Sequence, residues 1–208
     1  MKHKSQAVSE HAGDERPNPH ASAAASAAAP VDARIQRTRA VIDHAFVQLL
    51  FKHAYRTITV RDIALKAGVG RATFYAHYES KDQLLRSQLT RIILPVLKAC
   101  PEKPYLLDCT ALFDHVLSAP QLFRNIMSGG EGSGARVVRV ALQERVEVVA
   151  GFRDSIDRRL PLELVTRFVV STLLAVTLHA LQSKTPESPA EMQIRFARLA
   201  GSGIGELA

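Results

Sequence analysis

Two glycines separated by one residue, Gly68 and Gly70, constrain the fold of this chain more than any other feature of its sequence. Gly68 follows an amphipathic segment and can adopt, without strain, the left-handed conformation that ends a helix. Val69 is an isolated apolar residue suited to packing between two helices, and Gly70 can begin the next helix. The spacing predicts a helix ending at Ala67, a short turn and a second helix over residues 71–78. This arrangement is a helix-turn-helix.

Polar residues in suitable places support the ends of these helices. Thr59 can cap the first helix, and Asp62 falls in its first turn, where a negative charge meets the positive end of the helix dipole. Ser80 can cap a third helix. Apolar residues recur between these caps at helical spacing. The inward-facing residues predicted for the first and third helices are Ile63, Ala64, Ala67, Leu84, Leu85, Leu89, Ile92 and Ile93.

A second interpretation of the two glycines is a loop that binds a nucleotide phosphate. A dinucleotide-binding loop requires a preceding strand and a third glycine. The segment before Gly68 has helical periodicity instead, and Thr73 occupies the third position. The Gly-Lys-Ser/Thr signature of the other common phosphate loop is also absent. The sequence therefore predicts neither a nucleotide site nor any other cofactor here.

Positive charge is concentrated around the helix-turn-helix. The 208 residues carry a formal net charge of +7. Residues 32–91 alone contain 11 Lys and Arg against 5 Asp and Glu. A basic region of this kind favours a polyanionic partner such as nucleic acid. Charge alone is equally compatible with a basic protein that is merely soluble.

Composition divides the chain into three parts. Residues 1–31 are rich in Ala, Ser and Pro and have almost no large apolar residues, so we expect a disordered tail. A short helix in its alanine run is the alternative. Residues 32–80 are expected to form the helix-turn-helix domain, which starts with an amphipathic helix capped by Asp32. Residues 81–208 are expected to form a larger domain, with a connecting helix over 81–99.

The remainder of the chain has helical periodicity. Pro95 is expected to kink or end the connecting helix because it lacks a backbone N–H. The glycine-rich segment 129–135 is expected to be a loop. Helices are predicted over residues 106–119, 121–128, 136–160, 161–183 and 189–201. Strand alternation does not persist anywhere, so the predicted fold class is all-α with about nine helices.

Cysteine content and hydropathy point to a protein of the cytoplasm. The two cysteines, Cys100 and Cys109, are too few for a disulfide framework or a cysteine-rich zinc site. They fit a reducing compartment. Charged residues and prolines in the first 31 residues argue against a signal peptide. The longest apolar segment, residues 164–181, is interrupted by polar residues, and no membrane partner is predicted.

Residues 58–85, ITVRDIALKAGVGRATFYAHYESKDQLL, resemble the TetR family of transcriptional regulators. The shared pattern is a Thr before the helix that ends at Ala67, Ile-Ala within that helix and Ala-Gly-Val at the turn. Thr-Phe-Tyr follows in the helix over residues 71–78, and Ser-Lys precedes a leucine pair. The chain departs from it at Gly70, Ala72 and Tyr78, where Ser, Gly and Phe are commoner. The resemblance implies a homodimer that binds a palindromic DNA operator, usually as a repressor. A small-molecule effector bound in the C-terminal domain usually releases such a regulator.

The helix predicted over residues 71–78 is expected to read DNA bases and to hold phosphates around them. Arg71 can make two hydrogen bonds to guanine O6 and N7, and Ala72 is short enough to touch a thymine methyl. By the resemblance, Arg61 matches a base or backbone contact. The positions that match frequent phosphate contacts are Thr59, Thr73, Tyr75, His77 and Lys81. Phe74 and Tyr78 are expected in the core, and His77 has the alternative of being a packed histidine.

The last two helices carry apolar faces too broad for one core contact. A four-helix interface across a two-fold axis would bury both; covering their own domain is the alternative. The residues expected at this interface are Leu164, Phe168, Thr172, Leu173, Val176, Met192, Phe196 and Leu199. The candidate walls of an effector pocket are Phe113, His115, Val116, Phe123, Met127, Phe152 and Phe168.

Catalysis is not predicted, because the sequence contains no recognisable set of nucleophile, base and orienting group. Metal-ligand motifs are not found either. Two functions remain. The first is a DNA-binding regulator that responds to a small molecule. The second is a DNA-binding protein of the same fold whose C-terminal domain binds a protein partner or no ligand.

Overall fold

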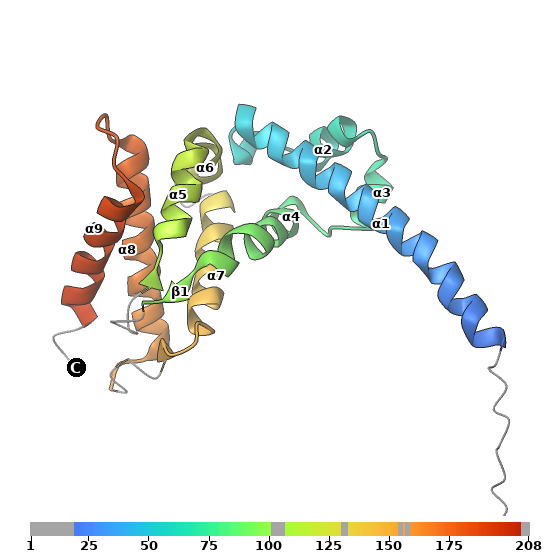
Figure 1. The fold of residues 1–208 in the computed structure, drawn as a ribbon. Coiled ribbons are helices and arrows are strands. Elements are labelled where there is room, and N and C mark those ends of the chain that lie inside the picture. Colours follow the sequence, from blue (N-terminus) through green and yellow to red (C-terminus); the bar gives the residue numbers. More distant parts are fainter. Residues whose placement is uncertain (1–18, 101–106, 130–132, 154–155, 157–158, 205–208) are drawn as a thin grey trace, which may run out of the picture. The chain divides into compact units, whose positions relative to one another are not determined.

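The computed structural model describes residues 19–100, 107–129, 133–153, 156 and 159–204. Helices dominate this part of the chain, so the all-α prediction is confirmed (Figure 1). The nine α-helices of the described residues are α1 (Pro19–Lys52), α2 (Val60–Ala67), α3 (Arg71–Tyr75), α4 (Lys81–Gln88), α5 (Thr110–Ser118), α6 (Pro120–Met127), α7 (Ser133–Glu147), α8 (Leu162–Gln182) and α9 (Pro189–Ile204).

The chain divides into two compact units, the first ending at Arg39 and the second starting at Ala40. The described part of the first unit is the N-terminal portion of α1. Residues 1–18 of the predicted tail lie outside the described residues. From Pro19 the chain is helical, which corrects the tail prediction in favour of the helix in the alanine run, since alanine has the highest helix propensity. Asp32 consequently lies within α1 rather than at its N-cap.

In the second unit, the helix-turn-helix has the predicted local chemistry. Thr59 is the N-cap of α2 and forms a capping box with Asp62. Gly68 ends α2 with a φ of 67°, the left-handed conformation that favours glycine. Gly70 is the N-cap of α3, and Ser80 is the N-cap of α4 with its hydroxyl accepting from the Gln83 N–H. These local predictions are confirmed.

The second helix of the helix-turn-helix, α3, was predicted over residues 71–78 but ends at Tyr75. The N–H groups of His77 and Tyr78 both bond to the Phe74 carbonyl, which tightens the chain into a turn. Tyr78 then enters the core, where 1% of it is exposed, and bonds to Asp43 of α1. The helix therefore ends because a tertiary contact of Tyr78 replaces its second turn.

The connecting helix predicted over 81–99 is also shorter. The α-helical part, α4, ends at Gln88 and is followed by a π-helical turn (Leu89–Ile93) and a 3₁₀ turn (Leu94–Val96). Pro95 cannot donate a backbone hydrogen bond, so the helix changes its geometry before it. Two strands of two residues each, β1 (Lys98–Ala99) and β2 (Leu107–Asp108), then pair antiparallel. They were not predicted, since two residues are too few to show alternation.

The helix predicted over 136–160 is wrong in its extent. Helix α7 begins at Ser133 and ends at Glu147, and a turn follows in which Gly151 has a φ of 81°. The segment predicted as a loop, 129–135, contributes its last residues to α7, while residues 130–132 lie outside the described part. Gly134 is buried in the first turn of α7, where it packs closely on Tyr55.

The last two helices, α8 and α9, lie side by side (Figure 1). Ser188 and Glu191 bond reciprocally before α9, as expected for a Ser-Pro helix start. Helix α8 is long and apolar enough to cross a membrane by length and composition alone, and 44% of its most apolar window is buried in the chain. A core helix of a soluble protein passes the same test.

Candidate nucleic-acid interface and effector cavity

Helix α3 contains four of the eight residues that were predicted to contact DNA, and it exposes all four. Arg71, Ala72, Thr73 and Tyr75 are exposed, with 55% of Tyr75 accessible. Phe74 is fully buried and meets Tyr75 edge to face, with ring centroids 5.6 Å apart. The five-residue helix is thus anchored by one aromatic residue while its other side chains face outward.

Helix α2 packs against α3 and exposes Arg61 and Thr59. The Thr59 hydroxyl donates to Asp62 Oδ2 over 2.7 Å and accepts from the Asp62 N–H over 3.2 Å. Hydrogen bonds from the side chain and then the backbone of Thr59 lower the pKa of Asp62. The Thr59 hydroxyl is therefore already engaged in capping α2. His77 is half-buried at the turn after α3.

Lys81 does not share this exposed face. Its Nζ donates to the carbonyls of Tyr55 and Ile58 over 2.9 and 2.7 Å. It also lies 4.5 Å from the centre of the Tyr55 ring. Burial lowers the pKa of Lys81. The ammonium thus joins the 3₁₀ turn Tyr55–Thr57 to the start of α4, a packing role that its motif position did not indicate.

A buried carboxylate, Asp43, connects three segments of the DNA-binding region. Tyr78 donates to its Oδ1, and Nη2 of Arg91 lies 2.8 Å from its Oδ2. Asp43 is 5% exposed. Sequence reasoning missed this residue, although an acidic residue next to Ile42 in the apolar stripe of α1 was a signal that it has buried partners.

A second polar contact joins the DNA-binding region to α7. Tyr55 donates to Oδ1 of Asp82, and Nη2 of Arg136 on α7 lies 3.6 Å from Asp82 Oδ2. Burial, followed by the bond to Asp82, raises the pKa of Tyr55. Gly134 lies against the same ring, since a Cβ there would be 3.0 Å from Tyr55 Cδ1. This contact was not predicted, because nothing local relates Tyr55 to α7.

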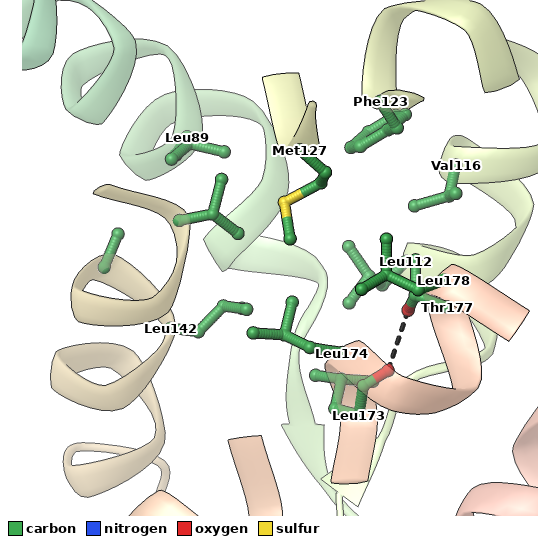
Figure 2. Close-up of a pocket in the computed structure, with 12 residues that line it drawn as sticks. Leu89, Leu112, Val116, Phe123, Met127, Leu142, Leu173, Leu174, Thr177 and Leu178 are labelled. Atoms are coloured by element: carbon green, nitrogen blue, oxygen red, sulfur yellow. Dashed lines mark hydrogen bonds between the residues drawn. The ribbon is translucent and has the colours of Figure 1, made fainter. Parts of the chain in front are cut away.

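The larger domain contains an apolar cavity, which Figure 2 shows from close by. Its volume is about 40 Å³. None of the described residues that line it is charged. The hydroxyl of Thr177 is bonded to the Leu173 carbonyl over 2.8 Å, and the thioether of Met127 points into the cavity. The lining residues are Leu89, Leu112, Val116, Phe123, Met127, Val138, Ala141, Leu142, Leu173, Leu174, Thr177 and Leu178.

Three of the seven predicted pocket residues line this cavity: Val116, Phe123 and Met127. His115 lines a neighbouring cavity. The other three, Phe113, Phe152 and Phe168, line neither of these two cavities. Phe113 and Phe152 are fully buried core residues, and Phe168 is 40% exposed on α8. Aromatic residues in a helical domain are more often core than ligand contacts, and only the tertiary packing separates the two.

The predicted interface residues of α8 and α9 fall into two groups. Leu173, Val176, Met192 and Phe196 are buried within the chain, because α8 and α9 pack on the rest of the domain. Thr172 is partly buried and bonds to the Phe168 carbonyl. The exposed apolar residues are Leu164 (58%), Phe168 (40%), Leu199 (54%) and Ile194 (54%), the last absent from the predicted set. The outward face is therefore narrower than predicted.

Helix α6 lies between the cavity and two helix ends. Arg124 donates from Nε and Nη2 to the Leu181 carbonyl near the end of α8, over 2.9 and 2.7 Å. Asn125 donates from Nδ2 to the Leu50 carbonyl near the end of α1, over 2.7 Å. Phe123 and Met127, on the same helix, line the cavity. One short helix thus contacts the cavity, the DNA-binding region and α8.

Comparison with known proteins agrees with this arrangement. Residues 42–87 match the family model described as bacterial regulatory proteins, tetR family. An uncharacterized HTH-type transcriptional regulator of Bacillus subtilis, YxbF, is 33% identical over 96 residues, which cover 45% of this chain and 21% of that relative. The aligned part thus spans about a fifth of the relative's length.

Solved structures resemble more of the chain. A TetR transcriptional regulator from Streptococcus agalactiae has a TM-score of 0.60 and 23% identity, covering 83% of this chain and 98% of its own. NalD from Pseudomonas aeruginosa, the secondary repressor of the MexAB-OprM multidrug efflux pump, has a TM-score of 0.52 and 16% identity, covering 82% and 98%. At sequence identities this low, the similarity to these two structures shows a shared fold. Together with the family-model match over residues 42–87, it shows that the chain resembles TetR-family transcriptional regulators in its helix-turn-helix and in its fold.

Proposed function

We propose that this protein is a sequence-specific DNA-binding repressor that a small molecule releases from a palindromic operator in the cytoplasm. The observation that carries the proposal is helix α3, which is anchored by buried Phe74 and exposes Arg71, Thr73 and Tyr75 together. A recognition helix needs this combination, because its base-reading side chains must be outside while its axis is held firmly.

The exposed residues divide into base readers and phosphate contacts. Arg71 opens α3 and is proposed to bind guanine O6 and N7, while Ala72 touches a thymine methyl. The proposed phosphate contacts are Arg61, Thr73, Tyr75 and His77, with Arg61 also able to reach a base. Thr59 is not in this set, because its hydroxyl and its backbone N–H both donate to Asp62 Oδ2. Lys81 is left out of this set because its ammonium bonds to two carbonyls inside the domain.

Dimerisation through α8 and α9 is the second part of the proposal. Leu164, Phe168, Ile194 and Leu199 leave apolar surface exposed on these two helices. A two-fold partner that covered this surface would present a second α3, and two recognition helices bind half-sites about 34–36 Å apart. A palindromic operator follows from that symmetry.

Effector release is the third part. The apolar cavity supports a ligand of low polarity, since burying a charged group there would leave it without a partner. Helix α6 contributes Phe123 and Met127 to the cavity and, through Asn125, bonds to the end of α1. A ligand that displaces α6 would therefore act on the DNA-binding region. Pro95, which lies beyond the α-helical part of the connector, is a second candidate for transmitting such a movement.

Selection of bound sequences from random DNA, followed by fluorescence titration, tests the proposal. We expect a palindromic sequence bound by a dimer, with affinity falling steeply as salt rises. Arg71→Ala should weaken binding of the selected sequence by about 1–3 kcal/mol and relax its sequence preference. Arg153→Ala, an exposed arginine after α7, is the matched control and should bind as the native protein does. Failure to enrich any sequence would contradict the proposal.

The alternative function is a DNA-binding protein whose C-terminal domain recognises a protein partner or no ligand. The exposed apolar residues of α8 and α9 favour it if they remain uncovered in solution. A protein that is monomeric on its own operator would support this alternative, because a dimer uses the same surface.

A further inference from the structure

A second cavity adjoins the one in Figure 2, with which it shares Leu89 and Phe123 as walls. Its volume is about 60 Å³. Residues of α1 and α4 form one side of it, and residues of α5 and α6 form the other. It therefore lies where the DNA-binding region meets the larger domain.

Gln88 is the feature that distinguishes this second cavity. It lines the cavity and is only 7% exposed. Its Oε1 accepts a hydrogen bond from Arg91 Nη2 over 2.9 Å. Its Nε2 is buried and has no hydrogen-bond partner among the described residues. Buried donors are nearly always paired in folded proteins, so this amide group calls for an acceptor that the described residues do not provide.

The other residues that line the second cavity have few polar groups that could bind such an acceptor. His115 lines the same cavity, and its ring meets Phe123 edge to face, with centroids 5.8 Å apart. The remaining lining residues are apolar. Among the residues that the structure describes, no carboxylate, lysine or arginine lines either cavity. A charged ligand would therefore be buried without a countercharge, whereas a neutral ligand with one acceptor oxygen would satisfy Gln88.

We propose that the effector is an uncharged, mainly apolar molecule with one hydrogen-bond acceptor, whose apolar part fills the first cavity and whose acceptor binds Gln88 Nε2 in the second. This inference rests on the proposed effector response. It adds the class of ligand and the residue that selects it. A ligand lying across Phe123 occupies both cavities, and the second cavity includes Val47 and Leu50 of α1, so its occupation acts directly on the DNA-binding region.

The test compares two probes of nearly the same shape, acetophenone and ethylbenzene, which differ by a carbonyl in place of a methylene. Calorimetric titration of the full chain gives the dissociation constant of each, without DNA. Ethylbenzene enters any apolar cavity more readily from water, so the informative quantity is how Gln88→Met changes each constant. We expect Gln88→Met to weaken acetophenone about fivefold, the contribution of one neutral hydrogen bond. Ethylbenzene should bind Gln88→Met within about twofold of the native protein.

Gln182→Met is the matched control, because this exposed glutamine at the end of α8 lines neither cavity. It should leave both affinities unchanged. A second measurement needs no variant: the side-chain amide resonance of Gln88 in the isotope-labelled native protein should move with acetophenone and stay in place with ethylbenzene. This measurement decides the matter if Gln88→Met does not fold.

Three results would overturn the inference. Neither probe binds, Gln88→Met weakens the binding of both probes equally, or the chemical shift of the Gln88 amide does not change when acetophenone is added. These outcomes are independent of DNA. If the carbonyl selectivity is found but acetophenone-type ligands leave operator binding unchanged, the ligand site stands and the proposed effector response fails instead.

Discussion

The phenol of Tyr78 donates a 2.5 Å hydrogen bond to Oδ1 of Asp43, which joins the turn after α3 to α1. Both residues are buried, and Arg91 lies on the other carboxylate oxygen. The orientation of the recognition helix therefore depends on a polar contact inside the domain as well as on apolar packing around Phe74.

Removing the Tyr78 hydroxyl should destabilise the protein. Tyr78→Phe leaves one buried carboxylate oxygen without its donor, and we expect a loss of about 1–3 kcal/mol in the free energy of unfolding. Urea denaturation followed by circular dichroism measures it. Tyr75→Phe, at the exposed neighbour on α3, is the control and should change stability by less than about 0.5 kcal/mol. Equal effects of the two substitutions would contradict the structural role of Asp43.

Lys81 should matter for stability rather than for contact with DNA. Lys81→Met keeps most of the apolar stem but removes the bonds to the Tyr55 and Ile58 carbonyls, so we expect a loss of about 1–2 kcal/mol in the free energy of unfolding. DNA affinity measured well below the melting temperature should change little. A large, sequence-independent loss of DNA affinity with unchanged stability would restore Lys81 as a phosphate contact.

The capping box of α2 predicts a dependence of stability on pH. Hydrogen bonds from Thr59 hold the pKa of Asp62 below its ordinary value of 3.8. A carboxyl whose folded pKa is depressed contributes stability above its unfolded pKa, and this contribution is lost as pH falls through the folded value. Below about pH 3.8 the melting temperature of the native protein should therefore fall more steeply than that of Asp62→Asn. Asp114→Asn, at an exposed position of α5, should retain the native slope.

Gly134 is expected to tolerate no side chain. A Cβ at this position would lie 2.3 Å from the Ile126 carbonyl oxygen and 3.0 Å from Tyr55 Cδ1. Gly134→Ala should therefore cost about 1–3 kcal/mol of stability, despite the better helix propensity of alanine. Gly70→Ala is the steric control, because the nearest atom to its Cβ is 3.8 Å away, and it should cost less than Gly134→Ala although it replaces an N-cap glycine. Thermal melts of the two variants that coincide would show that α7 can move away from Tyr55.

The exposed apolar residues of α8 and α9 predict that the protein forms a dimer. Phe168→Glu places a charge on the exposed apolar surface and should shift the protein from dimer to monomer in sedimentation velocity, with weaker operator binding. Ala190→Glu, exposed at the start of α9, should remain dimeric. A native protein that sediments as a monomer at micromolar concentration would argue for the alternative function.

Local chemistry explains which parts of the fold could be predicted from the sequence. Thr59, Gly68 and Ser80 act on the backbone within a few residues of themselves, so their roles as cap, stop and cap could be inferred without knowing any partner. The end of α3 could not, because it depends on Tyr78 reaching Asp43, which is 35 residues away.

In the candidate sites too, features set by neighbouring residues could be predicted, and features set by distant residues could not. The exposure of Arg71 and Tyr75 followed from helical spacing around Phe74. The inward turn of Lys81 did not, since its acceptors are two backbone carbonyls, one in the 3₁₀ turn Tyr55–Thr57 and one at Ile58 just after it, and this turn has no sequence signature. The cavity was predicted only in part, because Phe113 and Phe152 share the composition of a ligand pocket but pack in the core. Gln88 has no sequence signal except a polar residue on an apolar face.

Arg124 and Asn125 are adjacent in the chain, yet they bond to the ends of two different helices. Successive side chains of an α-helix point about 100° apart, so both contacts depend on how α6 is rotated about its axis. A single inserted or deleted residue before Arg124 would turn both side chains away from their carbonyls. Among descendants of this sequence, the length of α6 before Arg124 should therefore stay constant.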